Sequence, residues 1–318
     1  MSLNAPFPWF GGKRKVASEV WTRLGDVANY VEPFFGSGAV LLGRPSVSGN
    51  ETINDLDGYV ANFWRSMKLS PEATAEHADQ TVNENDLHAR HVWLLQRRET
   101  LQSQLEGDPE WHDPKIAGWW VWGLACWIGS GFCSGKGPWW VNGAGQLVHL
   151  GDNGQGVNRK LVHLGNNGRG ERLLPWFRAL AERLRRVRVC SGDWTRVSGP
   201  SVTFKHGLTG VFLDPPYADS ADRTSDLYRE DSERVAHDVR DWAVANGDNP
   251  LLRIALCGYE GEHDIPASWS THRWSAGEGF GGQGAERTKN GRRERIWFSP
   301  HCLQQRQGSL FGETEVQS

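Results

Sequence analysis

The chain is organised around the stretch Phe212-Leu213-Asp214-Pro215-Pro216-Tyr217. The apolar residues that lead into it and the prolines that follow predict a buried parallel strand with an abrupt end. Proline cannot continue a sheet ladder and holds the backbone in a rigid, extended turn. Asp214 and Tyr217 are therefore expected at the carboxyl end of a strand, where open α/β sheets bind ligands.

The four residues from Asp214 to Tyr217 suit one kind of chemistry. The Asp214 carboxylate and the Pro215 carbonyl are hydrogen-bond acceptors, and the Tyr217 ring offers a flat face for stacking. Two acceptors around an amino group on a planar ring draw its hydrogens out of plane and leave the nitrogen lone pair free to attack an electrophile. Hydrogen bonds to a charged acceptor are worth roughly 1.5–3 kcal/mol, and stacking a base on an aromatic ring adds about 1–3 kcal/mol. Taken alone, an aspartate that caps a turn beside a packed tyrosine explains the four residues equally well.

The composition excludes several classes of protein. The 318 residues suffice for one large or two modest domains. A mean hydropathy of -0.56 and the lack of a long apolar run argue against a membrane span, and residues 1–6 lack the features of a signal peptide, so we expect a cytoplasmic protein. The five cysteines form no CxxC pair, which predicts reduced thiols and no metal site. A net charge of -3 leaves room only for a local basic face.

Two glycine loops precede the central stretch. Residues 6–15 place paired glycines before a helical pattern and supply Lys13, a charge suited to a carboxylate or a phosphate. Residues 29–42 predict a strand, a loop with Gly36 and Gly38, and a short helix. This order is typical of the opening βα turn of a nucleotide-binding sheet.

Three acids follow predicted strands. Residues 52–55 predict a strand that ends in Asp55, at a distance from the glycine loop that suits a carboxylate binding ribose hydroxyls. Residues 187–190 predict another strand, which Asp193 follows, and Asp214 is the third acid of this kind. One such acid is unremarkable, but three of them with a glycine loop in front indicate a single ligand cleft.

The middle of the chain predicts an insertion of helices and loops. Ser70 and the following proline are typical of a capped helix start, and helical patterns cover residues 57–68, 86–105 and 174–186. Residues 119–140 are dense in Trp and Gly. Their first half predicts a buried helix, and their second half predicts a loop with Lys136 beside two Trp, as on a base-stacking surface. An aromatic core with glycine turns is the alternative.

A 14-residue repeat follows, in which residues 147–156 are echoed by residues 161–170. Each copy contains Asn-Gly, a signal for a tight turn. Nearby cations predict contact with phosphates or base edges, and a surface ornament without a role is the alternative. These cations are Arg159, Lys160 and Arg169.

The last third predicts elements that complete a sheet. Residues 218–228 are polar, as expected of a mobile lid, and residues 232–246 predict a helix capped by Ser232. Strands are expected at residues 251–257 and 296–298. A basic cluster before the final strand fits phosphate contact or a solvated charge run: Arg287, Lys289, Arg292, Arg293 and Arg295.

In this order, the motifs PFPWFGGK, EPFFGSGAV, IND, GDW and FLDPPY resemble the Dam-type class of adenine-N6 DNA methyltransferases. The resemblance implies a mixed α/β fold: a mostly parallel, seven-stranded, Rossmann-like sheet with helices on both faces. It implies a catalytic domain at residues 1–69 and 187–300, with a target-recognition domain inserted at residues 70–186. The insert departs from the Dam pattern, so a GATC target is not carried over.

The resemblance also implies a cofactor and a mechanism. S-adenosylmethionine is the expected methyl donor, and base flipping brings the target adenine of duplex DNA to the catalytic residues Asp214, Pro215, Pro216 and Tyr217. The cofactor-binding residues implied are Trp9, Lys13, Glu32, Phe34, Gly36, Gly38, Asp55, Asp193 and Asp214.

The tail at residues 301–318 contains Gln307, Leu310 and Phe311. It resembles the pentapeptide by which bacterial proteins dock on the DNA polymerase sliding clamp. Three other activities stay open. They are methylation of cytosine N4, methylation of RNA or of a protein amide, and non-catalytic DNA binding by a clamp-tethered protein. No cysteine lies in a Pro-Cys context, which disfavours methylation of cytosine C5.

Overall fold

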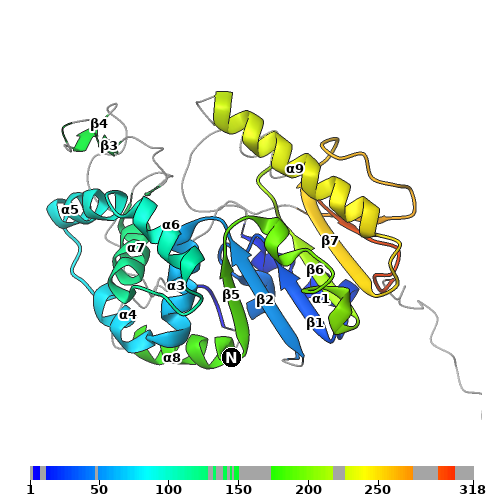
Figure 1. Ribbon diagram of the computed structural model, residues 1–318, viewed down its shortest axis with the longest axis horizontal. Helices are drawn as coiled ribbons and strands as arrows, with labels where there is room; N and C mark the ends of the chain where they lie inside the picture. The colour runs from blue at the N-terminus through cyan, green and yellow to red at the C-terminus, as the bar shows by residue number, and fades with distance from the viewer. Residues whose placement is uncertain are drawn as a thin grey trace, which may run out of the picture.

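One seven-stranded sheet forms the centre of the molecule (Figure 1). The computed structural model describes residues 3–7, 12–46, 49–127, 132–133, 139–141, 144, 147–149, 173–217, 226–274 and 293–304. The strand order is β5-β2-β1-β6-β7-β9-β8, with β1, β2, β5, β6 and β7 parallel and β9 antiparallel to both of its neighbours. The strands are β1 (Asn29–Glu32), β2 (Asn50–Asp55), β5 (Val187–Ser191), β6 (Thr209–Leu213), β7 (Leu252–Tyr259), β8 (Ser270–Arg273) and β9 (Glu294–Phe298). The expected mixed, mostly parallel sheet is confirmed.

Both faces of the sheet are buried, because successive side chains of a strand point to opposite faces. Phe212, Cys257 and Ile296 belong to a core on the side of α1 (Ala17–Leu24), α2 (Ala39–Leu42) and α3 (Gly58–Leu69). Val211 and Leu256 pack on the other side, against α9 (Asp226–Asn246) and the short 3-10 helix η3 (Trp194–Val197). The expectation of helices on both faces is confirmed.

The direction in which strands are added to the sheet reverses at β1. From β1 the chain adds β2 and then β5 on one side, and it returns to place β6 on the other side of β1. In open α/β sheets a ligand crevice forms at such a reversal, outside the carboxyl ends of the two strands. Here those ends are Glu32 on β1 and Leu213 on β6, so the fold alone points to this crevice.

A group of helices extends the molecule beyond β5 (Figure 1). α7 contacts α3, α4 and α5, and α8 contacts α3 and α4. Their buried side chains belong to the same apolar core as α1 and one face of the sheet. The helices are α4 (Pro71–Ala78), α5 (Glu84–Leu95), α6 (Arg98–Gly107), α7 (Pro114–Cys126) and α8 (Leu173–Leu184), and a two-stranded antiparallel ribbon joins β3 (Trp139–Val141) to β4 (Leu147–His149). The division of the chain into catalytic and recognition domains stays a prediction.

Arg65 on α3 connects these helices to the sheet. Its guanidinium donates to the carbonyls of Val189 on β5 (3.2 Å) and of Leu105 near the end of α6 (3.0 Å). It also donates to the carbonyls of Asp108 (2.8 Å) and Trp111 (3.3 Å) in the turn before α7. Arg65 is 4% exposed, so one buried cation satisfies four carbonyl groups, of which that of Leu105 is buried and the other three are partly buried.

Three expectations about helices were wrong in detail. The pattern over residues 86–105 predicts one helix, but the chain turns near Arg97 between α5 and α6, which lets Leu94 and Leu101 both reach the core. Ser70 does not cap α4, because its hydroxyl lies 2.9 Å from Nε2 of His112 instead. Ser232 does not cap a helix either, because α9 begins at Asp226. Residues 226–228 of the expected lid are therefore helical, and residues 218–225 lie outside the described part.

The edge strand β8 was not predicted. Its four residues are polar, and they alternate between half-buried and exposed. They carry no apolar run, so the sequence offers little signal for a strand there. As the edge strand, β8 pairs with β9 on one side, and Arg23 on α1 donates to the Ser270 hydroxyl.

Candidate active site

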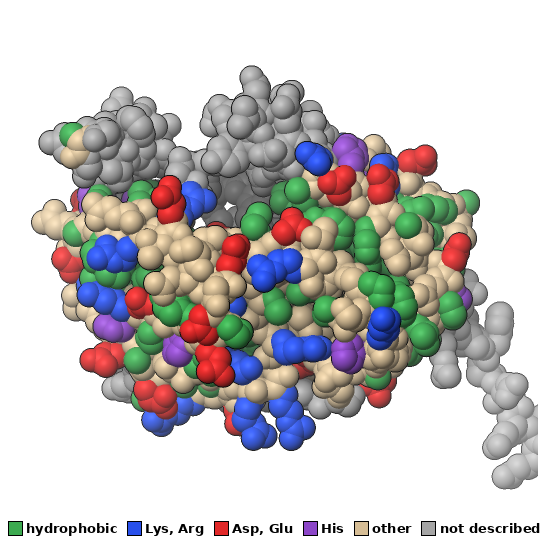
Figure 2. All heavy atoms as spheres, viewed as in Figure 1, with side chains coloured by type: hydrophobic (Ala, Val, Ile, Leu, Met, Phe, Trp, Pro, Cys, Tyr) green, Lys and Arg blue, Asp and Glu red, His purple; other side chains and the backbone are tan. Residues whose placement is uncertain are grey.

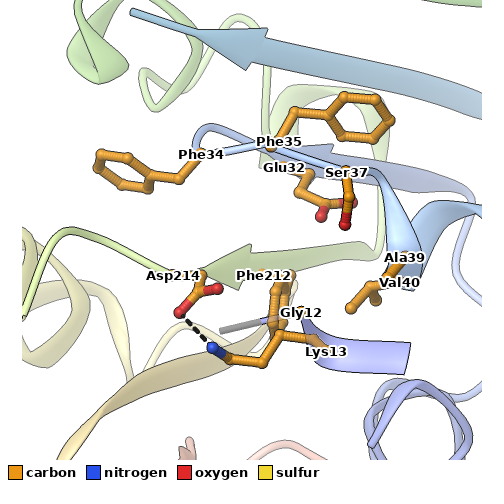
Figure 3. Close-up of a pocket in the computed structure, with 11 residues that line it drawn as sticks. Gly12, Lys13, Glu32, Phe34, Phe35, Ser37, Ala39, Val40, Phe212 and Asp214 are labelled. Carbon is orange, nitrogen blue, oxygen red and sulfur yellow. Dashed lines mark ion pairs between the residues drawn. The ribbon is translucent and has the colours of Figure 1, made fainter. Parts of the chain in front are cut away.

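A pocket of about 260 Å³, part of it open to solvent, lies at the carboxyl ends of β1 and β6 (Figure 3). It combines carboxylates, a buried lysine, aromatic rings and a glycine loop. In Figure 3 Lys13 and Asp214 face each other, while Phe34 and Phe35 point in opposite directions from the loop. The lining residues are Gly12, Lys13, Glu32, Phe34, Phe35, Gly36, Ser37, Ala39, Val40, Phe212 and Asp214.

The loop between β1 and α2 depends on its glycines. Gly36 and Gly38 have φ of +47° and +66°, a backbone region that residues other than glycine rarely adopt. A Cβ on Gly38 would lie 2.4 Å from Cζ of Phe35. The indole N–H of Trp64 donates to the Gly36 carbonyl at 2.9 Å. These contacts hold the loop close to the sheet and keep its backbone open to the pocket.

Asp55, at the end of β2, fastens the same loop. Its Oδ2 accepts the Gly36 N–H at 2.8 Å, and its Oδ1 accepts the Asp57 N–H at 2.9 Å. Burial, and then the neighbouring charge of Asp57, raise the pKa of Asp55 to about 7. The sequence singled out Asp55 as a ligand contact, and in the structure it also positions the glycine loop.

Glu32, at the end of β1, is buried beneath the pocket. The Tyr30 hydroxyl donates to its Oε2 at 2.7 Å, and the Leu41 N–H in α2 also donates to the carboxyl group. Burial raises the pKa of Glu32 well above its ordinary value, and the charges of Asp214 and Asp55 add to that effect. Glu32 is therefore a buried acid for which the neutral form is favoured.

Lys13 and Asp214 form an ion pair across the pocket, with Nζ and Oδ1 3.0 Å apart. The Lys13 side chain is 5% exposed and the Asp214 side chain 22% exposed. The ammonium also lies 5.3 Å from the ring centres of both Tyr217 and Trp274. Burial lowers the pKa of Lys13, but the acidic groups around it outweigh burial and raise the pKa overall. Lys13 is thus a charged lysine in a box of one carboxylate and two aromatic rings.

Tyr217 completes the group around Asp214. Its hydroxyl donates to Asp214 Oδ1 at 3.1 Å, and burial, followed by the Asp214 charge, raises the pKa of Tyr217 well above its usual value. The Tyr217 ring lies edge-to-face with Tyr259 at the end of β7, with ring centres 4.6 Å apart. Within the described residues, Lys13 and Tyr217 both reach Oδ1 of Asp214.

The structure brings most of the expected cofactor residues together. Lys13, Glu32, Phe34, Gly36 and Asp214 line the pocket, and Asp55 and Gly38 hold its loop. Asp193 lies outside the lining: it is exposed, and its carboxylate accepts the Thr195 N–H at 2.9 Å and caps η3. Trp9 lies outside the described residues.

Of the expected phosphate-contacting cations, the structure describes Arg293 and Arg295. Arg295 is 5% exposed and pairs with Glu260, so it is not part of a solvated charge run. The Arg293 guanidinium lies 5.5 Å from the ring centre of Tyr259, the partner of Tyr217. The other candidates, Lys136, Arg159, Lys160, Arg169, Arg287, Lys289 and Arg292, lie outside the described residues. So do Gln307, Leu310 and Phe311 of the tail.

Sequence reasoning missed three residues that surround Lys13 and Tyr217: Tyr259, Trp274 and Glu294. The alternation of β9 carried a signal for the last of these. Glu294, Ile296 and Phe298 share one face of the strand, and the two apolar residues are fully buried. Because arginines flank Glu294 on both sides, the sequence there indicates a solvated basic run, and the inward-facing acid is overlooked.

The described residues contain no group of three or more His, Cys, Asp or Glu arranged to hold a metal ion. Among the helices of the described part, none is long and apolar enough to cross a membrane. The five cysteines are free thiols, and burial raises the pKa of Cys257, which lies in β7 next to the site. The charged and aromatic side chains that line the pocket are those of Lys13, Glu32, Asp214, Phe34, Phe35 and Phe212.

Comparison with known families assigns this pocket to a class of enzymes. The family model of the D12 class N6 adenine-specific DNA methyltransferases matches residues 9–110. The matched segment contains Lys13, β1, the glycine loop and Asp55. No curated protein matches the chain. Residues 9–110 thus match the D12 class, and with the ordered motifs and the seven-stranded sheet this match identifies the protein as an enzyme that methylates N6 of adenine in DNA.

Proposed function

We propose that the methyl donor is S-adenosylmethionine, bound between β1 and β6, and that the target adenine is flipped out of duplex DNA onto Asp214 and Tyr217. Methyltransferases of this class generally use that donor. The observation that carries the proposal is the pocket at the reversal point of the sheet, which is bounded by the glycine loop on one side and the Lys13–Asp214 pair on the other. We propose the cytoplasm as the site of action because the substrate is DNA.

The pocket and the residues that hold its loop fit S-adenosylmethionine. The loop at Gly36 and Gly38 admits a ligand that approaches the backbone closely, and Asp55 is an acceptor suited to ribose hydroxyls. Phe34 stacks on Trp194 with ring centres 6.3 Å apart and offers an apolar surface for a purine ring. When bound, S-adenosylmethionine supplies an electrophilic methyl group on a sulfonium.

Asp214, Pro215 and Tyr217 would act on the target base. The Asp214 carboxylate and the Pro215 carbonyl accept the two hydrogens of the amino group, which localises the lone pair on N6. The Tyr217 ring, fixed by Tyr259, stacks on the base and offsets the few kcal/mol that flipping costs. The main contribution of the protein is then the positioning of N6 in line with the methyl group.

Mass spectrometry of nucleosides tests this function. DNA from cells that express the protein should contain N6-methyladenine above the level in cells with an empty vector. Because the cytosine amino group would suit the same acceptors, N4-methylcytosine in its place would contradict the adenine assignment. Sequencing of modified bases in the same DNA gives the recognition site, which is needed to measure activity on short duplexes.

Cofactor affinity should fall as pH is lowered through about 7. The pKa of Asp55 is raised to about 7, and its carboxylate binds ribose hydroxyls best when ionised. If the ionised form alone binds, the dissociation constant rises up to about tenfold for each pH unit below the pKa. Isothermal titration with S-adenosylmethionine at pH 6, 7 and 8 measures the effect.

Asp55→Asn is the matched control, since asparagine keeps the size of the side chain and cannot ionise in this range. The variant should bind the cofactor more weakly at pH 8 and show a much flatter pH dependence. An equal slope in wild type and variant would assign the titration to another group.

We propose that residues 70–186 recognise the DNA target and that the basic cluster near β9 contacts phosphates. The position of Arg293 beside Tyr259 supports the second part. The face in Figure 2 carries basic and acidic side chains interspersed, in keeping with the net charge of -3. DNA contact is therefore expected from local surfaces near the pocket, not from a general basic charge.

The clamp-binding proposal for Gln307, Leu310 and Phe311 rests on the sequence of the tail. Wild-type protein should be retained by immobilised bacterial sliding clamp, and the Leu310→Ala/Phe311→Ala double variant should not, because it removes the two apolar side chains expected to fill the clamp's pocket. Equal retention of the two proteins would refute the proposal. Methyltransferase activity on short duplexes should be the same in both.

A further inference from the structure

Glu294 is a buried acid that the proposed mechanism does not use. It is the first residue of β9 and 5% exposed, and it pairs in register with Tyr259. Its side chain shares a face of the sheet with Cys257, because Cys257 and Tyr259 are two residues apart on β7 and Glu294 and Ile296 are paired with them. Within the described residues, its Oε2 has no hydrogen-bond donor.

The titratable groups around Glu294 are those of the candidate active site. Its charge acts on Lys13 from η1 (Lys13–Lys15), on Tyr217 from the turn after β6, and on Cys257 and Tyr259 from β7. The charges that act on Glu294 in return are those of Lys13 and Asp214. Burial raises the pKa of Glu294 to about 7, with Lys13 opposing the shift and Asp214 adding to it.

The Asp214 carboxylate already accepts two contacts within this group of residues. Its Oδ1 accepts from both Lys13, at 3.0 Å, and Tyr217, at 3.1 Å. A carboxylate held by a full ammonium charge is a weaker acceptor for a neutral amino group. A second negative charge near Lys13 would weaken the electrostatic attraction between the Lys13 ammonium and Asp214. It would also make the electrostatic potential at the reacting nitrogen more negative.

From this geometry we infer that Glu294 is a positioning residue of the methyl-transfer site: its carboxylate competes with Asp214 for the Lys13 ammonium and so makes Asp214 available to the amino group of the target adenine. This inference rests on the proposed role of Asp214. Attack by N6 would form the N–CH3 bond as the S–CH3 bond of the donor breaks, which would leave a neutral thioether. The positive charge would pass from sulfur to the adenine amino group, which would then lose one proton to water. Ionised Glu294, near the amino group, would therefore favour the transition state over the ground state.

The expected signature is a pH profile. In wild type, kcat should rise as Glu294 ionises near pH 7. In Glu294→Gln this rise should be absent, and kcat at pH 8.5 should be roughly 10- to 100-fold below wild type, the effect of one nearby charge at an effective dielectric of about 20. Glu294→Asp should restore part of the rise. The KM values for DNA and S-adenosylmethionine should change little.

The matched control is Glu260→Gln, since Glu260 directly follows β7, at the end where Tyr259 pairs with Glu294, but is exposed and pairs with Arg295. Its pH profile should match wild type. A rise near pH 7 that persists in Glu294→Gln, or an equal loss of kcat at every pH, overturns the inference. Loss of activity in Asp214→Ala together with an unchanged pH profile of kcat in Glu294→Gln would refute the role of Glu294 and leave the role of Asp214 intact. Retained activity in Asp214→Ala would instead refute the proposed function.

Unfolding gives a readout that does not depend on activity. Because the folded-state pKa of Glu294 is raised, the stability of the wild type relative to Glu294→Gln should be constant below the ordinary pKa of glutamate. That relative stability should fall as pH rises toward about 7. Glu294→Gln should therefore gain in Tm over wild type between pH 5 and pH 8, by roughly 3–6 °C. A constant difference in Tm would show that Glu294 does not titrate there.

Discussion

Replacement of Asp214 by alanine is expected to lower kcat for adenine methylation by at least about 10³-fold. The substitution removes a charged acceptor worth roughly 1.5–3 kcal/mol per hydrogen bond. It also leaves the Lys13 ammonium, in a side chain 5% exposed, without its partner 3.0 Å away. Breaking a buried pair costs about 3–5 kcal/mol, so the reactive base would face an unpaired positive charge. Transfer of labelled methyl groups to a duplex with the recognition site measures kcat.

Two further variants separate charge from shape. Asp214→Asn keeps one acceptor oxygen in nearly the same place and should retain more activity than Asp214→Ala. Asp264→Ala removes an exposed carboxylate elsewhere and should behave as wild type. Folding of each variant is checked by its Tm. A folded Asp214→Ala protein with kcat within about tenfold of wild type would remove Asp214 from the mechanism, because general acid–base and charged contacts at a reacting group contribute about 10²-fold or more.

Arg65→Met should destabilise the fold strongly. It deletes all four hydrogen bonds by which Arg65 joins the carbonyls of Val189, Leu105, Asp108 and Trp111. Methionine fills a similar volume but donates nothing, so the buried Leu105 carbonyl and three partly buried carbonyls lose their donor, at about 1–3 kcal/mol for each group left unsatisfied. We expect a total loss of about 3–5 kcal/mol, which corresponds to a fall in Tm of roughly 6–15 °C.

Arg185→Met is the control for this substitution. Arg185 lies just beyond α8 and its side chain is 65% exposed, with an ion pair to Glu182 of 3.3 Å. Exposed pairs contribute about 0–1 kcal/mol, so its Tm should stay close to wild type. If Arg65→Met lowered the Tm no more than Arg185→Met does, the four hydrogen bonds would not stabilise the fold.

The parallel part of the sheet was predictable from the sequence because each strand there has a simple pattern. β6 is an apolar run ended by prolines, and β2 ends in Asp55 at the spacing of a ribose-binding acid. The break between α5 and α6 was not predictable, since the residues around Arg97 are ordinary helix formers and the turn follows from packing on α3. Local patterns do not contain that tertiary preference.

The site was partly predictable for the same reason. Lys13, Glu32, Phe34, Gly36 and Asp214 lie in motifs that are contiguous in sequence, and they line one pocket. The aromatic box around Lys13 and the approach of β9 depend on the pairing of β7 with β9, which joins residues far apart in the chain. No local spacing relates Tyr259, Trp274 or Glu294 to residue 13.

The apolar core that α4–α8 share with α1, α3 and one face of the sheet limits how this enzyme can change its target. A chimera that transplants residues 70–186 from a relative would also have to match the buried surface of α3, including Phe63 and Met67, and the carbonyl positions that Arg65 satisfies. On the proposal that residues 70–186 recognise the target, target preference would not be carried by an exchangeable cassette. Substitutions on the outer surface of the helices and in their connecting loops are the route by which new sequence preferences would arise without loss of the fold.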